Sequence, residues 1–269
     1  MPEKTGKMMS ILAHLEELRR RLLYVVIVLF AAFIACFQYW EYLLRWMKIP
    51  LTLVLKTKTT WPFVFPTYLP SPTKLIAVAP GEVLWMAFKI AFIASIFVSM
   101  PFILVQIWLF ISPGLLPRER RWALPFVVSA TVMFVIGALF CQYVVLPFAV
   151  RFLLTWGINE VTPMISIKEY VDFCGKFLLS FGLVFELPLI ITVLSRIGLI
   201  TPKFLAKNRK YAILAAFIAA AILTPTPDMF NQTLMAAPMI LLYEVGIIMA
   251  RITGRRKKEA EAEAGDSGR

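Results

Sequence analysis

The sequence is poor in the residues on which most enzyme and metal chemistry depends. It contains one histidine, three cysteines and only 16% charged residues in a chain of 269. The cysteines do not have the paired spacing of a metal site, and no phosphate-binding loop or nucleophile with a neighbouring base is visible. We therefore predict no enzyme activity, no metal and no cofactor.

Apolar residues are as abundant as charged residues are scarce. They make up 60% of the chain, and the mean hydropathy is +0.78, whereas a soluble domain has roughly 45–50% apolar residues. The net charge of +12 does not by itself indicate a nucleic-acid partner, because the cytoplasmic loops of membrane proteins collect lysine and arginine. These proportions predict an all-α integral membrane protein that binds no nucleic acid.

The long apolar runs predict where the chain crosses the membrane. A span needs about 20 residues to cross a hydrocarbon core of about 30 Å. The last two runs are short, since helices of their length would extend only about 20 and 25 Å. Lys89 lies near the outer end of the second predicted span, where its side chain could extend to the headgroups. We predict a single domain of residues 1–252 with six spans, at about residues 22–40, 83–110, 122–146, 170–194, 211–223 and 234–250.

Three segments outside the spans have compositions of their own. Residues 8–21 carry leucine and isoleucine on one helical face and charges on the other, which predicts an amphipathic helix at the membrane surface. Residues 41–80 contain six prolines, and we predict a loop of extended, partly ordered backbone. The charged residues 253–269 predict a disordered, solvated tail.

The distribution of lysine and arginine predicts the orientation of the chain. Of the 28 basic residues, 19 lie in the amino end, the tail and two alternate loops. Because basic residues are enriched on the cytoplasmic side of membrane proteins, this pattern predicts cytoplasmic N and C termini with six crossings between them.

One carboxylate interrupts the fourth predicted span. Glu186 lies inside the apolar run at 170–194, and Pro188 follows closely. An ionised Glu near the middle of a bilayer costs on the order of 2.5–3.5 kcal/mol, so such a residue usually faces protein or trapped water. We predict that Glu186 is compensated inside the protein and that Pro188 bends or loosens the helix beside it.

Five sequence motifs occur in order along the predicted spans. Together they resemble TatC, the family of multispanning receptor subunits of the twin-arginine protein translocase, and the resemblance extends from about residue 10 to residue 252. The long first loop and the tail carry little of the family pattern. The motifs are HLEELRRRL at 14–22, PGE at 80–82, QIWLFISPGLLPRERR at 106–121, FGLVFELP at 181–188 and LTPTPDMFNQ at 223–232.

The resemblance implies a function in protein export. Members of this family recognise folded cargo proteins by an amino-terminal twin-arginine signal peptide, and export is driven by the proton-motive force. The resemblance also implies two single-span partners, TatA and TatB, contact with membrane lipid, and a homo-oligomer within the complex. It implies a place in the bacterial cytoplasmic (inner) membrane and no cofactor.

Two carboxylates are the predicted readers of the signal. The resemblance gives this role to Glu17 and Glu119 on the cytoplasmic face. Arginine can pair with a carboxylate through a planar, two-pronged contact that lysine cannot reproduce. Glu16 and Arg19 are weaker candidates in the first motif. The alternative for Glu17 is an ordinary helical ion pair with Arg21, four residues later. Glu119 has a similar alternative, because Arg118, Arg120 and Arg121 flank it.

The resemblance assigns Glu186 to contact with a transmembrane helix of a partner. The alternative is a structural acid, hydrogen-bonded within the bundle. Asp228 and Gln232 match the family's Pro-Asp-x-Phe-x-Gln pattern in the last hairpin, and with Glu244 they are candidate companions of Glu186. We predict that Glu82 is a helix-start acid favoured by the helix dipole rather than a binding residue.

Acids inside the membrane also suggest a second function. An ion-coupled solute transporter could use Glu186 and Glu244 as proton sites. Transporters of this kind are commonly built from inverted repeats, and no such repeat of the helix pattern is visible in the sequence. We therefore favour a translocase receptor.

Overall fold

The computed structural model describes residues 11–56, 75–111, 123–155, 164–224 and 228–266. Within these ranges the chain is helical, and the one pairing of extended backbone is an isolated bridge between Ile76 and Ser166. A short π-helix, η2 (Cys141–Val145), joins α6 to α7. The helices are α1 (Ile11–Gln38), α2 (Trp40–Met47), α3 (Ile49–Lys56), α4 (Glu82–Ile111), α6 (Ala123–Phe140), α7 (Leu146–Thr155), α8 (Ile167–Val184), α9 (Leu187–Arg196), α10 (Pro202–Lys207), α11 (Arg209–Leu223) and α12 (Met229–Asp266).

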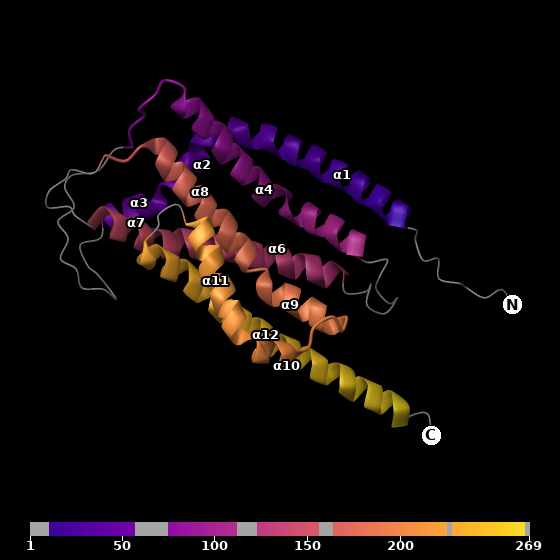
Figure 1. Ribbon diagram of the computed structural model, residues 1–269. Helices are drawn as coiled ribbons and strands as arrows, with labels where there is room; N and C mark the ends of the chain where they lie inside the picture. Colours follow the sequence, from indigo (N-terminus) through magenta and orange to yellow (C-terminus); the bar gives the residue numbers. More distant parts are fainter. Residues whose placement is uncertain (1–10, 57–74, 112–122, 156–163, 225–227, 267–269) are drawn as a thin grey trace.

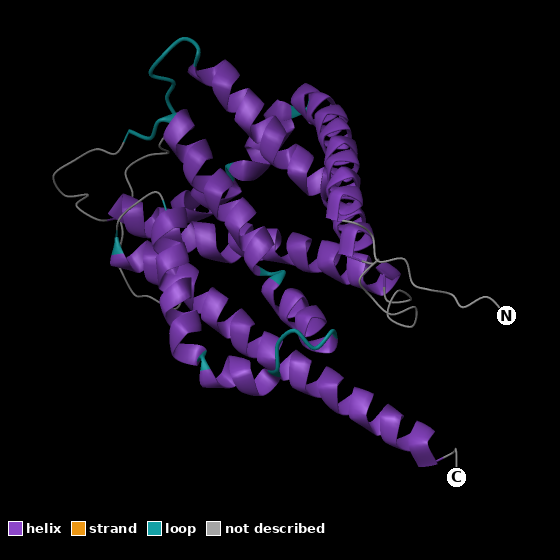
Figure 2. Ribbon diagram, turned by 45° about the vertical axis from the view of Figure 1, so that its right-hand side comes forward, coloured by secondary structure: helices purple, strands orange, loops and turns teal. Residues whose placement is uncertain are grey.

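The long helices lie side by side, so that the described connections gather at two ends of the bundle (Figures 1 and 2). α1 packs against α4, α6 packs against both α4 and α8, and α9 packs against α12. We call the end that holds the start of α1 and the end of α4 the N-terminal end. The opposite end holds the starts of α4 and α8, and we call it the Glu82 end.

Five helical stretches of the described chain are long and apolar enough to cross a membrane. They cover His14–Gln38, Glu82–Phe110, Leu124–Leu154, Ile167–Arg196 and Met229–Ile252. The prediction of a multi-pass, helical membrane protein is therefore confirmed. α11 has only 15 residues, and its length of about 22 Å is less than a hydrocarbon core of about 30 Å, so this segment is short, as predicted.

The last helix is longer than the sequence pattern predicts. Its apolar stretch has 24 residues, Met229–Ile252, so the prediction of a short final span at 234–250 is wrong. The stretch begins earlier because Asp228 caps α12 and residues assigned to the turn enter the helix. α12 then continues to Asp266, where the charge pattern predicted a disordered tail. Alanine, glutamate and lysine, which dominate this segment, are all strong helix formers.

Residues 11–56 also differ from the prediction. α1 is one continuous helix, so the predicted amphipathic helix and the first span are not separate elements. α2 and α3 are helical, although the prolines predicted extended backbone there. Pro50 is compatible with α3 because it lies in the first turn, where a backbone N–H has no intrahelical acceptor.

Two side chains attach the end of α2 to the bundle. The Gln142 amide in η2 donates to the Trp46 carbonyl oxygen at 2.7 Å, and the Tyr170 hydroxyl in α8 donates to the Met47 carbonyl oxygen at 2.9 Å. The last carbonyl groups of a helix lack intrahelical donors. The bundle therefore supplies these donors, which holds α2 and α3 against η2 and α8.

α6 and α8 approach each other closely in the centre of the bundle. A Cβ atom on Gly137 would lie 2.6 Å from the Phe181 carbonyl oxygen, and one on Gly182 would lie 2.7 Å from the Phe134 ring. Small residues at such positions let helix backbones pack closely. α8 thereby becomes the best-buried helix of the bundle, with Phe177 and Phe181 almost fully enclosed.

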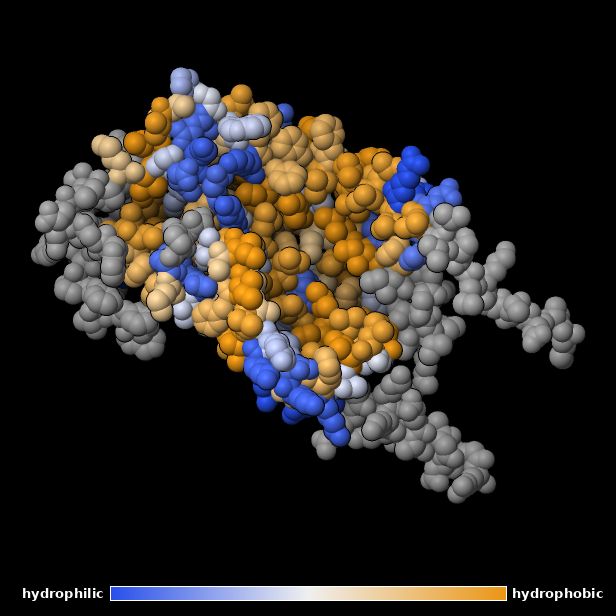
Figure 3. All heavy atoms as spheres, viewed as in Figure 1, coloured by the Kyte–Doolittle hydropathy of each residue, from blue (hydrophilic) through white to orange (hydrophobic). Residues whose placement is uncertain are grey.

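The surface separates into an apolar middle and polar ends. Figure 3 shows hydrophobic residues over the middle of the visible face and hydrophilic residues near the starts of α1, α8 and α11. Many large apolar side chains, such as Phe30, Val98 and Leu183, are more than 60% exposed. In a membrane these side chains face lipid, so their exposure is consistent with a spanning bundle.

Candidate functional site

Five side chains form a cluster at the N-terminal end, which we call the Glu17 cluster. Arg21 Nε donates to Glu17 Oε1 at 3.0 Å, and Arg21 Nη2 donates to the same oxygen. Arg21 Nη1 donates to Gln106 Oε1 of α4 at 3.3 Å. The His14 ring stacks on Phe110 of α4, with ring centroids 4.3 Å apart. The helical ion pair between Glu17 and Arg21 is therefore present, and it is tied to a second helix.

The second oxygen of the Glu17 carboxylate is not used. The side chains of Glu17 and Arg21 are only 11% and 18% exposed, so this is not an ordinary solvated pair. Glu17 Oε2 is buried and has no hydrogen-bond partner in the described part of the chain. A buried charged oxygen without a donor is unfavourable. Among the described residues, the cluster therefore leaves one strong acceptor without a donor.

The other predicted signal-binding residues have different places. Glu16 and Arg19 are exposed on α1, outside the hydrogen bonds of the Glu17 cluster. Glu119 falls between residues 112 and 122, outside the described residues. Of the two predicted carboxylates, the structure thus describes Glu17.

Glu186 lies at a break between two helices. α8 ends at Val184 and α9 begins at Leu187, and the Glu186 N–H donates to the Leu183 carbonyl oxygen at 3.1 Å. Pro188, in the first turn of α9, has no N–H with which to continue the helix through this point. The prediction that Pro188 loosens the helix beside Glu186 is confirmed.

The Glu186 side chain is buried without full compensation. The residue is 4% exposed, and its Oε1 atom has no hydrogen-bond partner among the described residues. Buried polar side-chain atoms in folded proteins are usually hydrogen-bonded. At this oxygen, the predicted compensation inside the protein is therefore missing from the described chain.

The three candidate companions of Glu186 have partners of their own. Asp228 caps α12 by accepting from the Asn231 N–H at 2.7 Å and from the Asn231 side-chain amide at 2.9 Å. Gln232 donates to the Phe217 carbonyl oxygen at 3.1 Å, which closes the hairpin of α11 and α12. Glu244 accepts from Arg209 at 2.6 and 2.9 Å. In this arrangement each of the three residues joins or caps helices.

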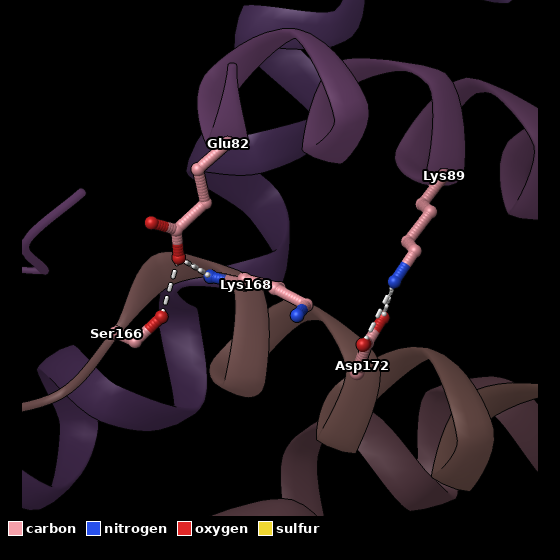
Figure 4. Close-up of polar contacts among 5 residues, drawn as sticks. All are labelled: Glu82, Lys89, Ser166, Lys168 and Asp172. Carbon is pink, nitrogen blue, oxygen red and sulfur yellow. Dashed lines mark hydrogen bonds and ion pairs between the residues drawn. The ribbon is translucent and has the colours of Figure 1, made fainter. Parts of the chain in front are cut away.

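Glu82 joins two connections at the opposite end of the bundle. Its Oε2 accepts from the N–H groups of Val78 at 2.6 Å and Ala79 at 3.2 Å. Its Oε1 accepts from Ser166 Oγ at 2.5 Å and the Lys168 N–H at 3.1 Å (Figure 4). We call this arrangement the Glu82 clamp. Glu82 is indeed the first residue of α4, but its carboxylate also holds the start of α8.

Lys89 is paired within the protein. Its Nζ donates to both carboxylate oxygens of Asp172 in α8, at 2.6 and 2.8 Å (Figure 4). The prediction that this side chain extends to the headgroups is wrong, because an acid on the neighbouring helix lies within reach. The pair adds a second link between α4 and α8.

Sequence reasoning missed the partners that complete these clusters. Gln106 and Arg21 lie in motifs that the sequence displays, but their contact joins positions 85 residues apart. Asp172 could have been suspected, because it is an acid in the fourth predicted span and Lys89 is a base in the second. Ser166 gives no signal in the sequence, since a serine before a helix is common.

Two of the described carboxylates have the chemistry of a binding site. No group of three or more His, Cys, Asp or Glu residues in the described ranges could hold a metal ion. Two carboxylates, Glu17 and Glu186, each keep one buried oxygen without a donor. Such oxygens accept hydrogen bonds from arginine, amide or hydroxyl groups of a partner.

Comparisons with known proteins identify relatives along the whole chain. A model of the family described as Sec-independent protein translocase protein (TatC) matches residues 13–238. The Sec-independent protein translocase protein TatC of Koribacter versatilis is 38% identical over 270 residues, covering 100% of this chain and 95% of the relative. The TatC protein of Carboxydothermus hydrogenoformans is 39% identical over 245 residues, covering 91% of this chain and 94% of the relative.

Solved structures give the same result. A crystal structure of the twin arginine translocase receptor TatC superimposes with a TM-score of 0.76 at 34% sequence identity, covering 90% of this chain and 99% of that chain. A second structure of the receptor, in DDM, has a TM-score of 0.75 at 35% identity, covering 88% and 99%.

Proposed function

The chain belongs to the TatC family of Sec-independent protein translocase proteins, and on that basis we propose that it is the receptor for twin-arginine signal peptides in a bacterial translocase. Family membership makes it a transmembrane component of protein transport. The observation that supports the receptor role most directly is the buried, unpartnered Oε2 of Glu17. A guanidinium from a signal peptide would supply the donor that this oxygen lacks.

The chemistry of the cluster favours arginine over lysine. A guanidinium offers five N–H donors in one plane, whereas an ammonium is a compact charge without a fixed direction. The chain carries a net charge of +12, so it does not attract a basic peptide over long distances. Recognition then depends on short-range geometry and partial desolvation at a carboxylate, which is where the planar guanidinium has its advantage.

We assign the second arginine of the signal to Glu119. This residue belongs to the segment between α4 and α6, and the end of α4 lies at the N-terminal end because Gln106 contacts Arg21 there. Glu16 and Arg19 are exposed on α1 and would contact flanking parts of the peptide. Glu17 and Glu119 would then each pair with one arginine of the signal peptide.

Peptide binding to the purified full chain tests the receptor role. A fluorescent twin-arginine signal peptide should bind to the chain in detergent or nanodiscs, and a twin-lysine version should bind at least about tenfold more weakly. Glu17→Gln and Glu119→Gln should each weaken binding of the twin-arginine peptide. Glu41→Gln, which removes an exposed acid from α2, is the matched control. Equal binding of the two peptides would exclude this mechanism of recognition.

Glu186 supports a separate role in assembly. We propose that its unpartnered oxygen accepts a hydrogen bond from a polar side chain on the transmembrane helix of a single-span partner, TatA or TatB. The helix break places this carboxylate where α8 gives way to α9, inside a span. A photo-crosslinking residue at 186 should capture a partner helix, and the same residue at Leu124, which is 73% exposed on α6, should not. Equal capture from both positions would contradict a specific docking point.

The proposed topology has six crossings, with both termini in the cytoplasm. α11 would be the short crossing, and the bilayer would thin beside it or neighbouring helices would shelter it. Transport would then be driven by the proton-motive force across the inner membrane, with several copies of the chain in the complex. Cysteines at Lys210 and Met229, both exposed, test the topology. An impermeant thiol reagent added to intact cells should label only Met229→Cys, and labelling of both would refute the crossing.

A further inference from the structure

Arg21 makes an unusual contact with Glu17. Two of its N–H groups, Nε and Nη2, bond to one oxygen of the carboxylate, and Nη1 bonds to Gln106. A free guanidinium and a free carboxylate prefer a parallel pair of bonds that uses both oxygens. In the observed position the Arg21 guanidinium also contacts Gln106 in α4, and Glu17 Oε2 receives no hydrogen bond from the described residues.

Simple electrostatics gives Arg21 the wrong sign for a receptor site. A fixed guanidinium beside Glu17 repels an incoming cationic ligand, and it also neutralises the carboxylate that should attract that ligand. If charge alone mattered, removal of Arg21 would strengthen the binding of a twin-arginine peptide. If Arg21 were a competitor for the site, it would also occupy the oxygen that the ligand needs.

The geometry decides between these roles. A competitor would engage both oxygens of Glu17, but Arg21 engages one and leaves the other buried and without a partner among the described residues. The side chains of Glu17 and Arg21 are both well enclosed, and Gln106 fixes the guanidinium from a second helix. The carboxylate therefore has one orientation, with one oxygen committed and one available.

We propose that Arg21 is a positioning residue for recognition: held by Gln106, it fixes the Glu17 carboxylate so that a single oxygen, Oε2, is presented to an arginine of the ligand. This inference rests on the proposed signal-receptor function and concerns the same site. Because the carboxylate is oriented before the ligand arrives, the ligand does not have to order it on binding.

The positioning role requires a guanidinium. Lysine at position 21 would keep the charge and could bond to Glu17, but its ammonium cannot reach one Glu17 oxygen through two N–H groups and Gln106 through a third in the same plane. The positioning role also requires the side-chain oxygen of Gln106, Oε1, as the acceptor for Arg21. Leucine at position 106 would keep a similar volume and leave the charge of the cluster unchanged, while removing the acceptor for Arg21 Nη1.

Binding of the fluorescent twin-arginine peptide to the full chain tests the proposal. We expect Arg21→Gln to weaken binding by about tenfold, although electrostatics alone predicts tighter binding. Arg21→Lys should weaken binding similarly, because an ammonium group lacks the planar N–H donors that position Glu17. Gln106→Leu should weaken binding by about threefold, since one neutral hydrogen bond is lost. Arg20→Gln removes the same charge from an exposed neighbouring position and is the matched control, with binding unchanged or slightly tighter.

A second readout separates positioning from a general loss of structure. The ratio of twin-arginine to twin-lysine affinity should fall toward one in Arg21→Gln and Arg21→Lys, whereas Arg20→Gln should keep the ratio of the parent chain. If Arg21→Gln does not fold, as judged by its thermal unfolding, Arg21→Lys and Gln106→Leu carry the same test. Binding that is unchanged or tighter in the folded Arg21 variants overturns the proposal.

The controls distinguish this inference from the receptor function itself. If the parent chain does not prefer the twin-arginine peptide, or if Glu17→Gln binds as well as the parent, the receptor function fails. If both of these controls behave as expected and the Arg21 and Gln106 variants bind like the parent, only the positioning role fails.

Discussion

The Glu17 cluster and the Glu82 clamp are both built on a glutamate near the start of a helix, but they use it differently. Glu82 accepts four hydrogen bonds, two on each oxygen, from the loop before α4 and from the start of α8. Glu17 accepts bonds on one oxygen only, and the other is buried and unpartnered. A saturated carboxylate joins parts of its own chain, whereas a half-used carboxylate is available to another molecule.

This difference predicts that the two ends of the bundle respond to substitution in different ways. Changes at the Glu82 end should lower the stability of the fold. The molecules that remain folded should bind the signal peptide with unchanged affinity. Changes at the Glu17 cluster should mainly lower affinity, with a smaller loss of stability. Functional sites often retain unsatisfied groups of this kind at some expense of stability.

The largest effect on stability is expected at the clamp. Glu82→Gln keeps the size of the side chain but replaces one acceptor oxygen with an NH₂ group, which faces donors that it cannot satisfy. We expect the midpoint of thermal unfolding to fall by several degrees, more than in Glu17→Gln, Tyr170→Phe or Asp172→Asn. Glu169→Gln, at an exposed acid in the same turn region of α8, is the control. An unchanged midpoint in Glu82→Gln would remove the distinction between the two carboxylates.

Glu17→Gln should give the opposite pattern. The twin-arginine peptide should bind about tenfold or more weakly, because a charge-assisted contact is replaced by a neutral one. The midpoint of thermal unfolding should fall by less than in Glu82→Gln. Arg21 loses its charged partner, but the buried oxygen without a donor no longer carries charge. A fall in midpoint as large as that of Glu82→Gln would indicate that Glu17 is a structural residue like Glu82.

Tyr170→Phe tests the Glu82 end with a smaller change. The substitution removes the hydroxyl that donates to the Met47 carbonyl oxygen at 2.9 Å and leaves that buried carbonyl without this donor. We expect a loss of about 1 kcal/mol in the free energy of unfolding, with no change in peptide affinity. Weaker peptide binding in this variant would show that the two ends are coupled.

Asp172→Asn should have the smallest effect. The carboxylate and Lys89 are both partly exposed, at 28% and 38%, and ion pairs of this kind contribute about 0.5 kcal/mol. The double variant Lys89→Met with Asp172→Leu should recover most of the loss, because neither charge then remains without a partner. A loss as large as that of Glu82→Gln would make the ion pair, rather than the clamp, the main link between α4 and α8.

The positions of most spans could be predicted from the sequence. The apolar runs at 83–110 and 170–194 correspond closely to α4 and to α8 with α9. An apolar run of about 20 residues is typical of a membrane-spanning helix. Pro188 marked the break beside Glu186, since proline removes a backbone donor wherever it occurs. These features depend on the hydropathy and backbone chemistry of the residues themselves, and not on their contacts with distant parts of the chain.

Other parts of the fold could not be predicted in this way. Prolines suggested an extended loop after the first span, but Pro50 sits in the first turn of α3 and α2 is held by donors from Gln142 and Tyr170. The apolar pattern predicted a short final helix. It does not reveal the cap that Asp228 provides, which lets the helix begin earlier. In each case a contact or a cap outside the local pattern determined the outcome.

The sequence is enough to predict a bundle of membrane-crossing helices, to place the chain in the TatC family, and to mark Glu17 and Glu186 as unusual acids. Composition and motifs suffice for this, because the bilayer restricts what apolar helices can do. Which carboxylates have all their hydrogen-bond partners depends on how the helices pack. Hydrogen-bond partners such as Ser166 for Glu82 and Gln106 for Arg21 lie more than 80 residues away in the chain, and they meet only when the helices have packed.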